Sequence, residues 1–380
     1  MISVSICSPN GDIAAAWADL VARASSNVFM EPAALRVAEA TGFADVRMLL
    51  AWDDAATPCR LVGLWALQIK RIASFWPSVL DARPYNYAFL STPVVDPAYV
   101  DDVMPAMLRA IQHDPELPKV LHLHSFAQET ACYAALQREL TRQGGAQRML
   151  DETNRPYATR EEGIKKSGST RKKLRQDWNR LSGQGAVDVI NDKTPLRVME
   201  AFEIFLKLEQ ASWKGARGTA LLCDETDAAF VRKLVEMLSA EGRASVALLR
   251  VDGKAIAAQV LMYSAHVAYT WKTAFDADYA RFSPGMLLVD KITEQLFADP
   301  DIAALDSCSY EDGFMAKLWT GRRKMAEMLI HVGPGTSAAF ALEQARLLGY
   351  HEAKRLRNQW RARRAATQPA SAKVPLAQAS

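Results

Sequence analysis

The segment SVALLRVDGKAIAAQVLMYSAHVAYTWKTAFDADYARFSPGMLL, residues 245–288, contains the pattern that decides the fold we expect. Apolar residues alternate or run continuously in three stretches, which predicts the strands Ser245–Val251, Lys254–Tyr263 and Val267–Thr273. Asp252-Gly253 joins the first two strands as a tight hairpin turn, because these residue types suit such turns. The segment therefore predicts a meander of three strands.

The elements around this meander complete a longer order. Ser283-Pro284-Gly285 begins a helix over Gly285–Phe297, since Ser is a preferred N-cap and Pro suits the first helical position. Apolar spacing predicts the remaining elements of this half: a strand Ala186–Ile190, helices Pro195–Gln210 and Glu225–Ala240, a strand Ala304–Cys308, a short helix through Trp319 and a strand Glu327–Val332.

The first half of the chain repeats that order. Its predicted elements are a strand Ser3–Cys7, a helix Asp12–Ala24, a helix opened by Pro32, strands Val46–Trp52, Leu61–Ile72 and Asn86–Ser91, a helix Val100–His113, a strand Val120–His124, a helix Glu129–Thr141 and a strand ending at Leu150. Pro105 disfavours a helix interior, which suggests that the third helix begins near Met104. Both halves read strand, two helices, three strands, helix, strand, helix, strand, so we predict a structural duplication.

Composition agrees with two packed domains. The chain has 380 residues, 49% of them hydrophobic and 23% charged, and a net charge of only +3, which does not indicate nucleic acid as a partner. Five scattered cysteines fit a reducing compartment better than a disulfide framework. The start of the chain lacks the pattern of a secretory signal, and no apolar run approaches the ~20 residues of a membrane span. We therefore expect a cytoplasmic protein without an integral membrane segment.

The second half resembles the bacterial CelD-like acetyltransferases, a branch of the GNAT superfamily allied to the Fem peptidyltransferases. The resemblance covers roughly residues 27–332 and is carried by Asn27, Phe29, Glu31 and Pro32, Ser169-Thr170-Arg171-Lys172-Lys173-Leu174-Arg175, Asn179-Arg180-Leu181, Ser212-Trp213-Lys214-Gly215, Gly218, Phe275-Asp276 and Ser283-Pro284-Gly285-Met286-Leu287-Leu288. It implies an α+β protein with a tandem duplicated GNAT-like fold, in which mixed, mostly antiparallel sheets are flanked by helices.

The resemblance and the element order together give a domain plan. We expect a degenerate GNAT-like domain over 1–160, a basic linker helix over 161–183, an acyl-CoA-binding GNAT domain over 184–335, a basic helix over 336–364 and a disordered tail over 365–380.

The start of the helix at Ser283 is the expected cofactor site. A helix N-terminus presents unpaired N–H groups and partial positive charge, and Gly lets a ligand approach closely. GNAT enzymes hold the CoA pyrophosphate at this point, although Arg281 and Gly285 match their Arg/Gln-x-x-Gly-x-Gly/Ala signature only loosely. The resemblance thus assigns acetyl-CoA or another acyl-CoA to Arg281, Ser283, Gly285 and Met286; an ordinary capped helix is the alternative. The matching place in the first half, Thr92 to Pro97, has neither Gly nor Arg, so we expect no CoA there.

Acyl transfer needs a proton acceptor and a group that protonates the leaving thiolate. Asp276 follows the third strand and is the candidate base. Tyr310 is the candidate acid, as GNAT enzymes imply, and Asp306 at the end of the next strand is a further catalytic candidate. Turn or N-cap roles remain the alternative for the aspartates. Trp213 and Lys214 lie in the loop that forms an acceptor wall in GNAT proteins, so the resemblance implies that they hold the substrate; a surface loop with a buried indole is the alternative.

Two basic segments leave several roles open. Lys172 and Arg175 belong to a basic amphipathic helix that is either a solvated face or a site for an anionic substrate; DNA is not expected, since no recognised binding module accompanies the charge. The basic helix Ala338 to Arg364 is either solvated or in peripheral contact with an anionic membrane surface or partner. His122 and His124 share one strand face, but no third ligand accompanies them in sequence, so no metal is expected.

We therefore expect a GNAT-type acyltransferase, of the N-acetyltransferase kind, that moves an acetyl or other acyl group from CoA to an amine or hydroxyl. The resemblance points to a small-molecule or glycan-precursor acceptor in polysaccharide or envelope biosynthesis. A Fem-like transferase that uses aminoacyl-tRNA, and a scaffold that kept the fold without the chemistry, are the alternatives. The sequence does not indicate the oligomeric state.

Overall fold

The computed structural model describes residues 1–367, and the rest of the expected tail, 368–380, lies outside the described residues. The N-terminal half holds β1 (Ile2–Cys7), α1 (Ala14–Val21), α2 (Pro32–Ala40), β2 (Val46–Asp53), β3 (Arg60–Lys70), β4 (Val79–Asp81), β5 (Val94–Val95), α3 (Val100–His113), β6 (Val120–Ala127), α4 (Ala131–Gln143) and β7 (Gln147–Thr159).

The C-terminal half holds α5 (Ser169–Ser182), β8 (Val187–Ile190), α6 (Pro195–Ala211), α7 (Trp213–Ala216), α8 (Glu225–Ala240), β9 (Ala244–Val251), β10 (Lys254–Ser264), β11 (Val267–Phe275), α9 (Pro284–Ala298), β12 (Ala304–Asp306), β13 (Arg322–His331) and α10 (Ala338–Thr367). The α+β class and the repeated element order are thus confirmed. The short helix predicted through Trp319 is a 3-10 turn over Phe314–Lys317.

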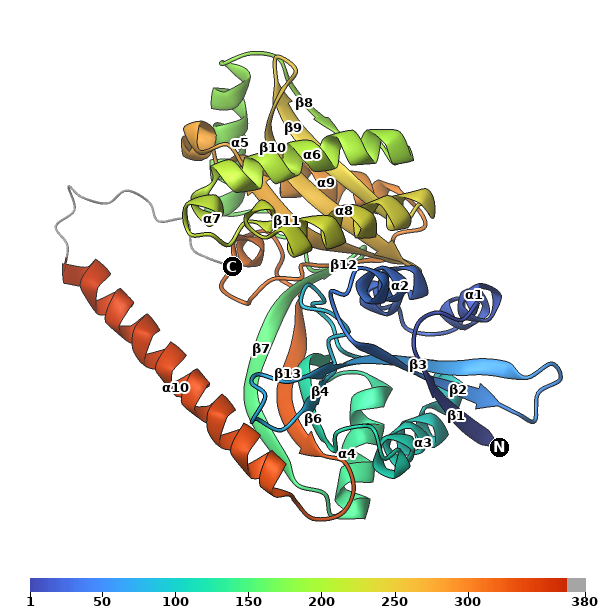
Figure 1. The fold of residues 1–380 in the computed structure, drawn as a ribbon. Helices are drawn as coiled ribbons and strands as arrows, with labels where there is room; N and C mark the ends of the chain where they lie inside the picture. The colour runs from blue at the N-terminus through green and yellow to red at the C-terminus, as the bar shows by residue number, and fades with distance from the viewer. Residues whose placement is uncertain (368–380) are drawn as a thin grey trace.

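The last strand of the C-terminal half lies in the sheet of the N-terminal half. The hydrogen-bonded order is β1-β2-β3-β4-β6-β13-β7-β12-β11-β10-β9-β8, so β13 stands between β6 and β7. Strand β7 pairs with β13 along Gln147–Pro156 and with β12 over Tyr157–Thr159, and Figure 1 shows this long strand joining the two bodies. We call the body around β1–β4, β6 and β13 the N-terminal lobe and the body around β8–β12 the C-terminal lobe.

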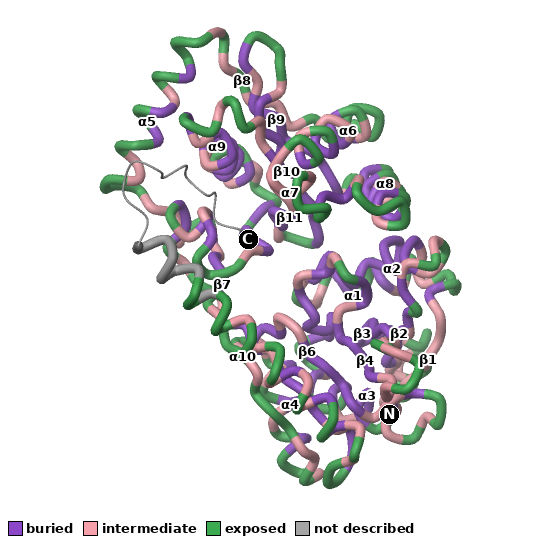
Figure 2. Tube along the Cα trace, turned by 60° about the vertical axis from the view of Figure 1, so that its left-hand side comes forward, coloured by how far each residue is buried: buried purple, intermediate pink, exposed green. Residues whose placement is uncertain are grey.

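Helices cover both faces of the C-terminal sheet, because apolar side chains along its strands point alternately to one face and to the other. Leu249 and Leu261 point to the face where α5 and α9 bury their apolar sides. Val246 and Val260 point to the opposite face, where α6 and α8 pack. Purple segments in Figure 2 mark these buried strands and helix faces.

The two lobes share one apolar core. Phe230 of α8 stacks on Phe43 with ring centroids 4.0 Å apart, and Tyr269 of β11 meets Phe29 edge-on at 5.8 Å. Glu31, almost fully buried, accepts a hydrogen bond from Arg243 of the other lobe at 2.7 Å. Apolar burial of this extent fixes the lobes relative to each other.

Several expected elements differ in the structure. The strand predicted to end at Leu150 continues to Thr159 as β7, and the strand predicted over Glu327–Val332 begins at Arg322 as β13, because the two pair along most of their length. Asn86–Ser91 is not a strand, and β4 takes its place in the sheet. Side chains supply hydrogen bonds to the backbone of this segment; Trp65 Nε1, for example, donates to Ser91 O at 3.0 Å. Helix α3 begins at Val100 and not near Met104, with Pro105 inside it. The basic helix begins only at Ser169. No described helix is long and apolar enough to cross a bilayer.

Candidate functional site

Strands β11 and β12 separate after a short parallel ladder. They pair only from Val267 with Ala304 to Tyr269 with Asp306, and β11 then continues to Phe275. Thr270 Oγ1 donates to the carbonyl oxygen of Asp306 at 3.3 Å just where the ladder ends. Within the described residues, one edge of β11 beyond this point has no strand partner, so its backbone groups are free to bind a ligand.

Helix α9 begins against the unpaired part of β11. Ser283 adopts the left-handed conformation with φ 52°, and Pro284 occupies the first turn. A Cβ on Gly285 would lie 3.4 Å from Thr273 Cγ2 and 3.5 Å from Phe275 Cδ1, which are ordinary contacts. The fold itself therefore does not require glycine here. Met286, partly buried, donates its backbone N–H to Ser283 O at 3.0 Å.

Cationic side chains gather around this helix start. Lys173 of α5 donates from Nζ to Ser283 Oγ at 3.0 Å and also pairs with Asp177. The guanidinium groups of Arg180 and Arg281 lie over the ring of Phe282, at 5.4 Å and 4.8 Å from its centroid. A helix N-terminus with added positive charge favours an anion such as a phosphate. We call Lys173, Arg281, Ser283 and Gly285 the α9 site.

The predicted residues Lys172 and Arg175 do not face this site. Both are exposed on α5, and Leu174 and Leu181 are the residues that pack on the lobe. The neighbouring residue Lys173 is the one that reaches Ser283. The basic run was visible in the sequence, but which lysine faces α9 depends on the packing of the two helices.

The corresponding helix start in the N-terminal lobe is acidic. Asp96 caps the turn before α3 by accepting from Ala98 N at 3.0 Å, and it pairs with Arg23. Asp101 and Asp102 stand in the first turn of α3. Asp96 and Asp101 are thus neutralised by Arg23 and Arg138, whereas Asp102 adds a carboxylate that would repel a phosphate. The absence of CoA from this half stays a prediction.

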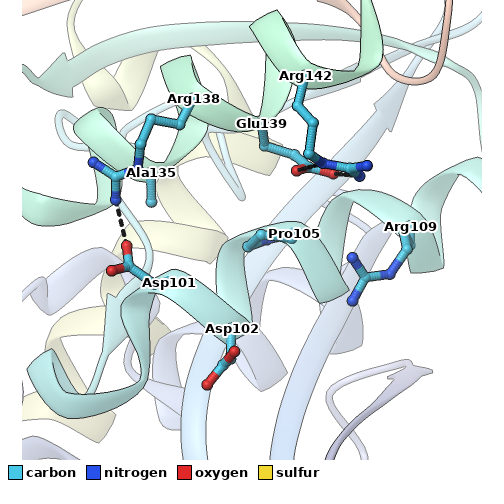
Figure 3. A pocket seen from close by; sticks show the side chains of 8 residues that line it. All are labelled: Asp101, Asp102, Pro105, Arg109, Ala135, Arg138, Glu139 and Arg142. Carbon is cyan, nitrogen blue, oxygen red and sulfur yellow. Dashed lines mark hydrogen bonds and ion pairs between the residues drawn. The ribbon is translucent and has the colours of Figure 1, made fainter.

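Charged side chains that line a hollow between α3 and α4 pair with one another. Figure 3 shows Arg138 pointing to Asp101, and Arg142 lying beside Glu139 at 2.6 Å. Because the lining groups neutralise each other, we assign no ligand to this hollow.

The three expected catalytic residues lie in different surroundings. Asp276 accepts from Asp278 N at 3.0 Å and from Lys254 Nζ at 2.9 Å. Burial acts to raise the pKa of Asp276, but these hydrogen bonds hold it below its usual value. Asp276 is seven residues beyond Tyr269, roughly 20 Å along the strand from the end of the ladder.

Asp306 is fully buried between two arginines. Its carboxylate lies 3.4 Å from Arg155 Nη1 and 3.3 Å from Arg323 Nη1, and it accepts from Cys308 N at 2.9 Å. These contacts tie β12 to β7 and β13, which is a structural arrangement. Tyr310, by contrast, is 58% exposed, and its ring contacts Lys354 of α10.

The expected acceptor residues stand beside a lysine that sequence reasoning missed. Lys214 of α7 donates to the buried Glu209 at 2.9 Å, and Arg217 covers the ring of Trp213. Nearby, Lys272 of β11 places Nζ 4.7 Å from the ring centroid of Tyr87 in the other lobe. Burial lowers the pKa of Lys272 to about 8; the carboxylates of Glu209 and Asp227 oppose this shift, and the charge of Lys214 adds to it. An amine that is partly neutral near physiological pH is a candidate for proton transfer or acceptor binding.

A cavity of about 420 Å³ lies between the N-terminal lobe, the segment after β12 and α10, and we call it the α10 cavity. It opens where β4 and β6 separate after the pairs Leu80 with Leu121 and Asp81 with His122. Polar side chains from both lobes line it, among them Arg83, His122, His124, Arg155, Tyr310, Glu327 and His351. Tyr310 is thus the predicted residue that the structure places at a cavity.

The comparisons with known proteins agree with this geometry. A family model described as an acetyltransferase (GNAT) domain matches residues 168–314, which include α5, β11 and the α9 site. No curated protein matches the chain in sequence.

Solved structures with a similar fold cover 86–89% of the chain. FemX superposes with a TM-score of 0.60 at 10% identity, covering 86% of this chain and 97% of that one. The C-terminal domain of a protein named as a lysylphosphatidylglycerol synthetase from Agrobacterium fabrum gives 0.53 at 16% identity, with coverage of 87% and 97%. L-PGS from Bacillus licheniformis gives 0.53 at 13% identity, with 89% and 97%. The chain therefore has a GNAT-like fold, and its residues 168–314 match a GNAT acetyltransferase domain; the narrower CelD-like resemblance stays a prediction.

Proposed function

We propose that this protein transfers an acyl group from acyl-CoA to an amine or hydroxyl acceptor, with the donor bound at the α9 site. The observation that carries the proposal is the start of α9 at Gly285 beside the unpaired edge of β11, with Lys173 at Ser283. The pyrophosphate would meet the helix N-terminus and these cations. The free backbone of β11 would hydrogen-bond the pantetheine arm toward the end of the ladder.

Chemistry then takes place near the end of the β11–β12 ladder. An attacking amine must lose a proton, and the thiolate that leaves CoA must gain one. Tyr310, four residues after Asp306 and exposed at the α10 cavity, is our candidate acid. Lys272, Trp213 and Lys214 form the candidate acceptor side. Asp276 sits at the phosphate end of β11, where its capping contacts account for its presence; its role as a base stays a prediction.

The acceptor side holds Lys214, Arg217 and Lys272 against the carboxylates of Glu209 and Asp227. This small excess of positive charge favours an acceptor that carries a carboxylate or phosphate. Lys214 and Lys272 lie close enough for the charge of one to depress the pKa of the other. A glycan precursor with a phosphate group fits this charge, and polysaccharide or envelope biosynthesis is the context that the family resemblance implies.

A second candidate is aminoacyl transfer from aminoacyl-tRNA, as the resemblance to Fem transferases implies. The fold likeness to FemX and the exposed Lys172 and Arg175 on α5 favour it. An exposed row of cations suits a nucleic-acid backbone, and binding of that kind weakens steeply with salt.

The two candidates differ in the donor, so a donor screen separates them. Melting temperature is measured with acetyl-CoA, longer acyl-CoAs and tRNA, since a ligand that binds the folded state raises it. We expect acyl-CoA to raise the melting temperature and tRNA to leave it unchanged at physiological salt. Stabilisation by tRNA alone would support the Fem-like reaction, and no shift with either donor would favour a non-catalytic scaffold.

A further inference from the structure

Two histidines of β6 face the α10 cavity side by side. His122 and His124 are alternate residues of one strand, so their side chains leave the same face of the sheet. Their ring centroids are 3.5 Å apart, and His122 is buried. Both residues line the cavity together with Glu327 of β13.

Glu327 reaches the histidines through an irregularity in its strand. The pairing of β13 with β6 shifts register between Ala326 and Met328, and the pairing with β7 shifts between Glu327 and Met328. Such bulges redirect a side chain and often occur beside functional sites. Here the bulge brings a carboxylate to a histidine that is 205 positions away in the sequence.

The donor atoms have the spacing of a tetrahedral metal site. Glu327 Oε1 lies 3.0 Å from His122 Nε2 and 3.6 Å from His124 Nδ1, and the three donor atoms lie within 4.8 Å of one another. Ligands at 2.0–2.1 Å from a tetrahedral Zn²⁺ are separated by about 3.3 Å. The observed distances bracket that value, so a cation would need only small movements of the side chains.

The carboxylate of Glu327 is the charge that favours a cation at these three residues. Asp81 is already paired with Lys70 at 2.8 Å and Arg83 at 3.1 Å. Glu327, within the part of the chain that the structure describes, has only imidazoles as partners within 4.0 Å. A partly buried carboxylate that lacks a lysine or arginine partner is costly unless a cation neutralises it.

The surroundings also supply an outer shell. His124 Nε2 lies 3.5 Å from Asp81 Oδ2 and 3.2 Å from Arg83 Nη2. With a metal on Nδ1, Nε2 would carry the proton and donate it to Asp81, the carboxylate–histidine–metal arrangement that orients many ligands; Arg83, which can only donate, would then turn away from Nε2 and keep its pairing with Asp81. His351 of α10 lies 3.4 Å from Glu327 on the helix that borders the cavity.

We propose that His122, His124 and Glu327 form a binding site for one divalent cation of the zinc class in the N-terminal lobe. The fourth coordination position faces the α10 cavity, where a water molecule or a substrate oxygen would occupy it. The site does not depend on the acyl donor, because none of its residues belongs to the α9 site. Imidazole and carboxylate ligands suit Zn²⁺ and Co²⁺ better than Mg²⁺ or Ca²⁺.

The test is titration of the full, tag-free chain with Co²⁺, after treatment with a chelator, followed by visible absorption. The proposal predicts one equivalent bound with the strong bands of four-coordinate cobalt, and displacement of that cobalt by Zn²⁺. Absence of stoichiometric binding, or the weak spectrum of six-coordinate cobalt, would overturn it. The wild-type spectrum decides the proposal even where a variant fails to fold.

Variants then assign the ligands. Glu327→Gln keeps the side-chain volume and is expected to weaken Co²⁺ binding by at least ~100-fold, since even the loss of an outer-shell partner costs 10–100-fold. His124→Ala is expected to do the same. His113→Ala is the matched control, because His113 is exposed on α3 and, among the described residues, bonds only Arg109 O. Unchanged binding in Glu327→Gln and His124→Ala would show that the cation sits elsewhere.

Discussion

Lys173 Nζ lies 3.0 Å from Ser283 Oγ, and this contact joins the basic helix α5 to the first turn of α9. Helix α5 thereby places a positive charge at the N-terminus of helix α9. Arg171 adds a second link by pairing with Asp290 of α9. The basic run of the sequence thus has two sides, one turned to α9 and one turned to solvent.

Mutations on these two sides of α5 should have different effects on acetyl-CoA binding. Lys173→Ala is expected to weaken acetyl-CoA binding about 10-fold, since a hydrogen bond to a charged group contributes roughly 1.5–3 kcal/mol. The Lys172→Ala, Arg175→Ala double variant is the control on the same helix, and it should change stability by less than ~0.5 kcal/mol and leave acetyl-CoA affinity unaltered. Calorimetric titration and melting temperature measure both. A larger loss in the double variant than in Lys173→Ala would place the anion on the solvent side of α5.

Lys272 should make stability depend on pH. Its pKa falls to about 8 in the folded chain because of burial, so the unfolded chain binds more protons between that value and the ordinary 10.5. The cost of burying the charge is full below pH 8 and disappears as pH rises toward 10.5. Lys272→Met is therefore expected to stabilise the protein at pH 7 by about 1 kcal/mol, less than the full shift implies because water screens a partly exposed group. Urea unfolding at pH 7 and pH 10 measures this; an equal gain at both values would contradict it.

Substitutions of Asp306 and Tyr310 should affect different properties, stability for Asp306 and turnover for Tyr310. Asp306→Asn leaves Arg155 and Arg323 without their buried carboxylate, which is expected to cost about 3–5 kcal/mol of unfolding free energy. Tyr310→Phe removes only an exposed hydroxyl, so it should leave the melting temperature unchanged and lower kcat by about 100-fold. Thermal unfolding and steady-state transfer rates distinguish the two. Full turnover in Tyr310→Phe would remove this residue from the mechanism.

Local sequence patterns predicted most of the elements. The helix Glu225–Ala240 was predicted to the residue, and the meander of β9, β10 and β11 to within one or two residues, because alternation and turn chemistry act over short distances. The strand expected over Asn86–Ser91 was wrong, since the side chains of Asn27 and Trp65 satisfy that backbone from afar.

Features that depend on contacts between residues far apart in the chain could not be predicted from the sequence. A strand pattern indicates an extended segment and its buried face, but not its neighbour, so the place of β13 in the N-terminal lobe could not be predicted. The same pairing brings Glu327 to His122 and His124, where the sequence showed no third ligand. Lys272 was missed for a similar reason, because its burial depends on Tyr87 in the other lobe.

Titration calorimetry of the full chain with acetyl-CoA tests the central claim most directly. We predict about one CoA per chain, and loss of binding in Gly285→Glu, where a carboxylate at the buried start of α9 would repel the pyrophosphate. Gly349→Glu is the matched control, since Gly349 is an exposed helical glycine with open space around its Cα. It should bind like the wild type. A stoichiometry near two, or undiminished affinity in Gly285→Glu with the fold intact, would contradict the assignment of the donor to the α9 site.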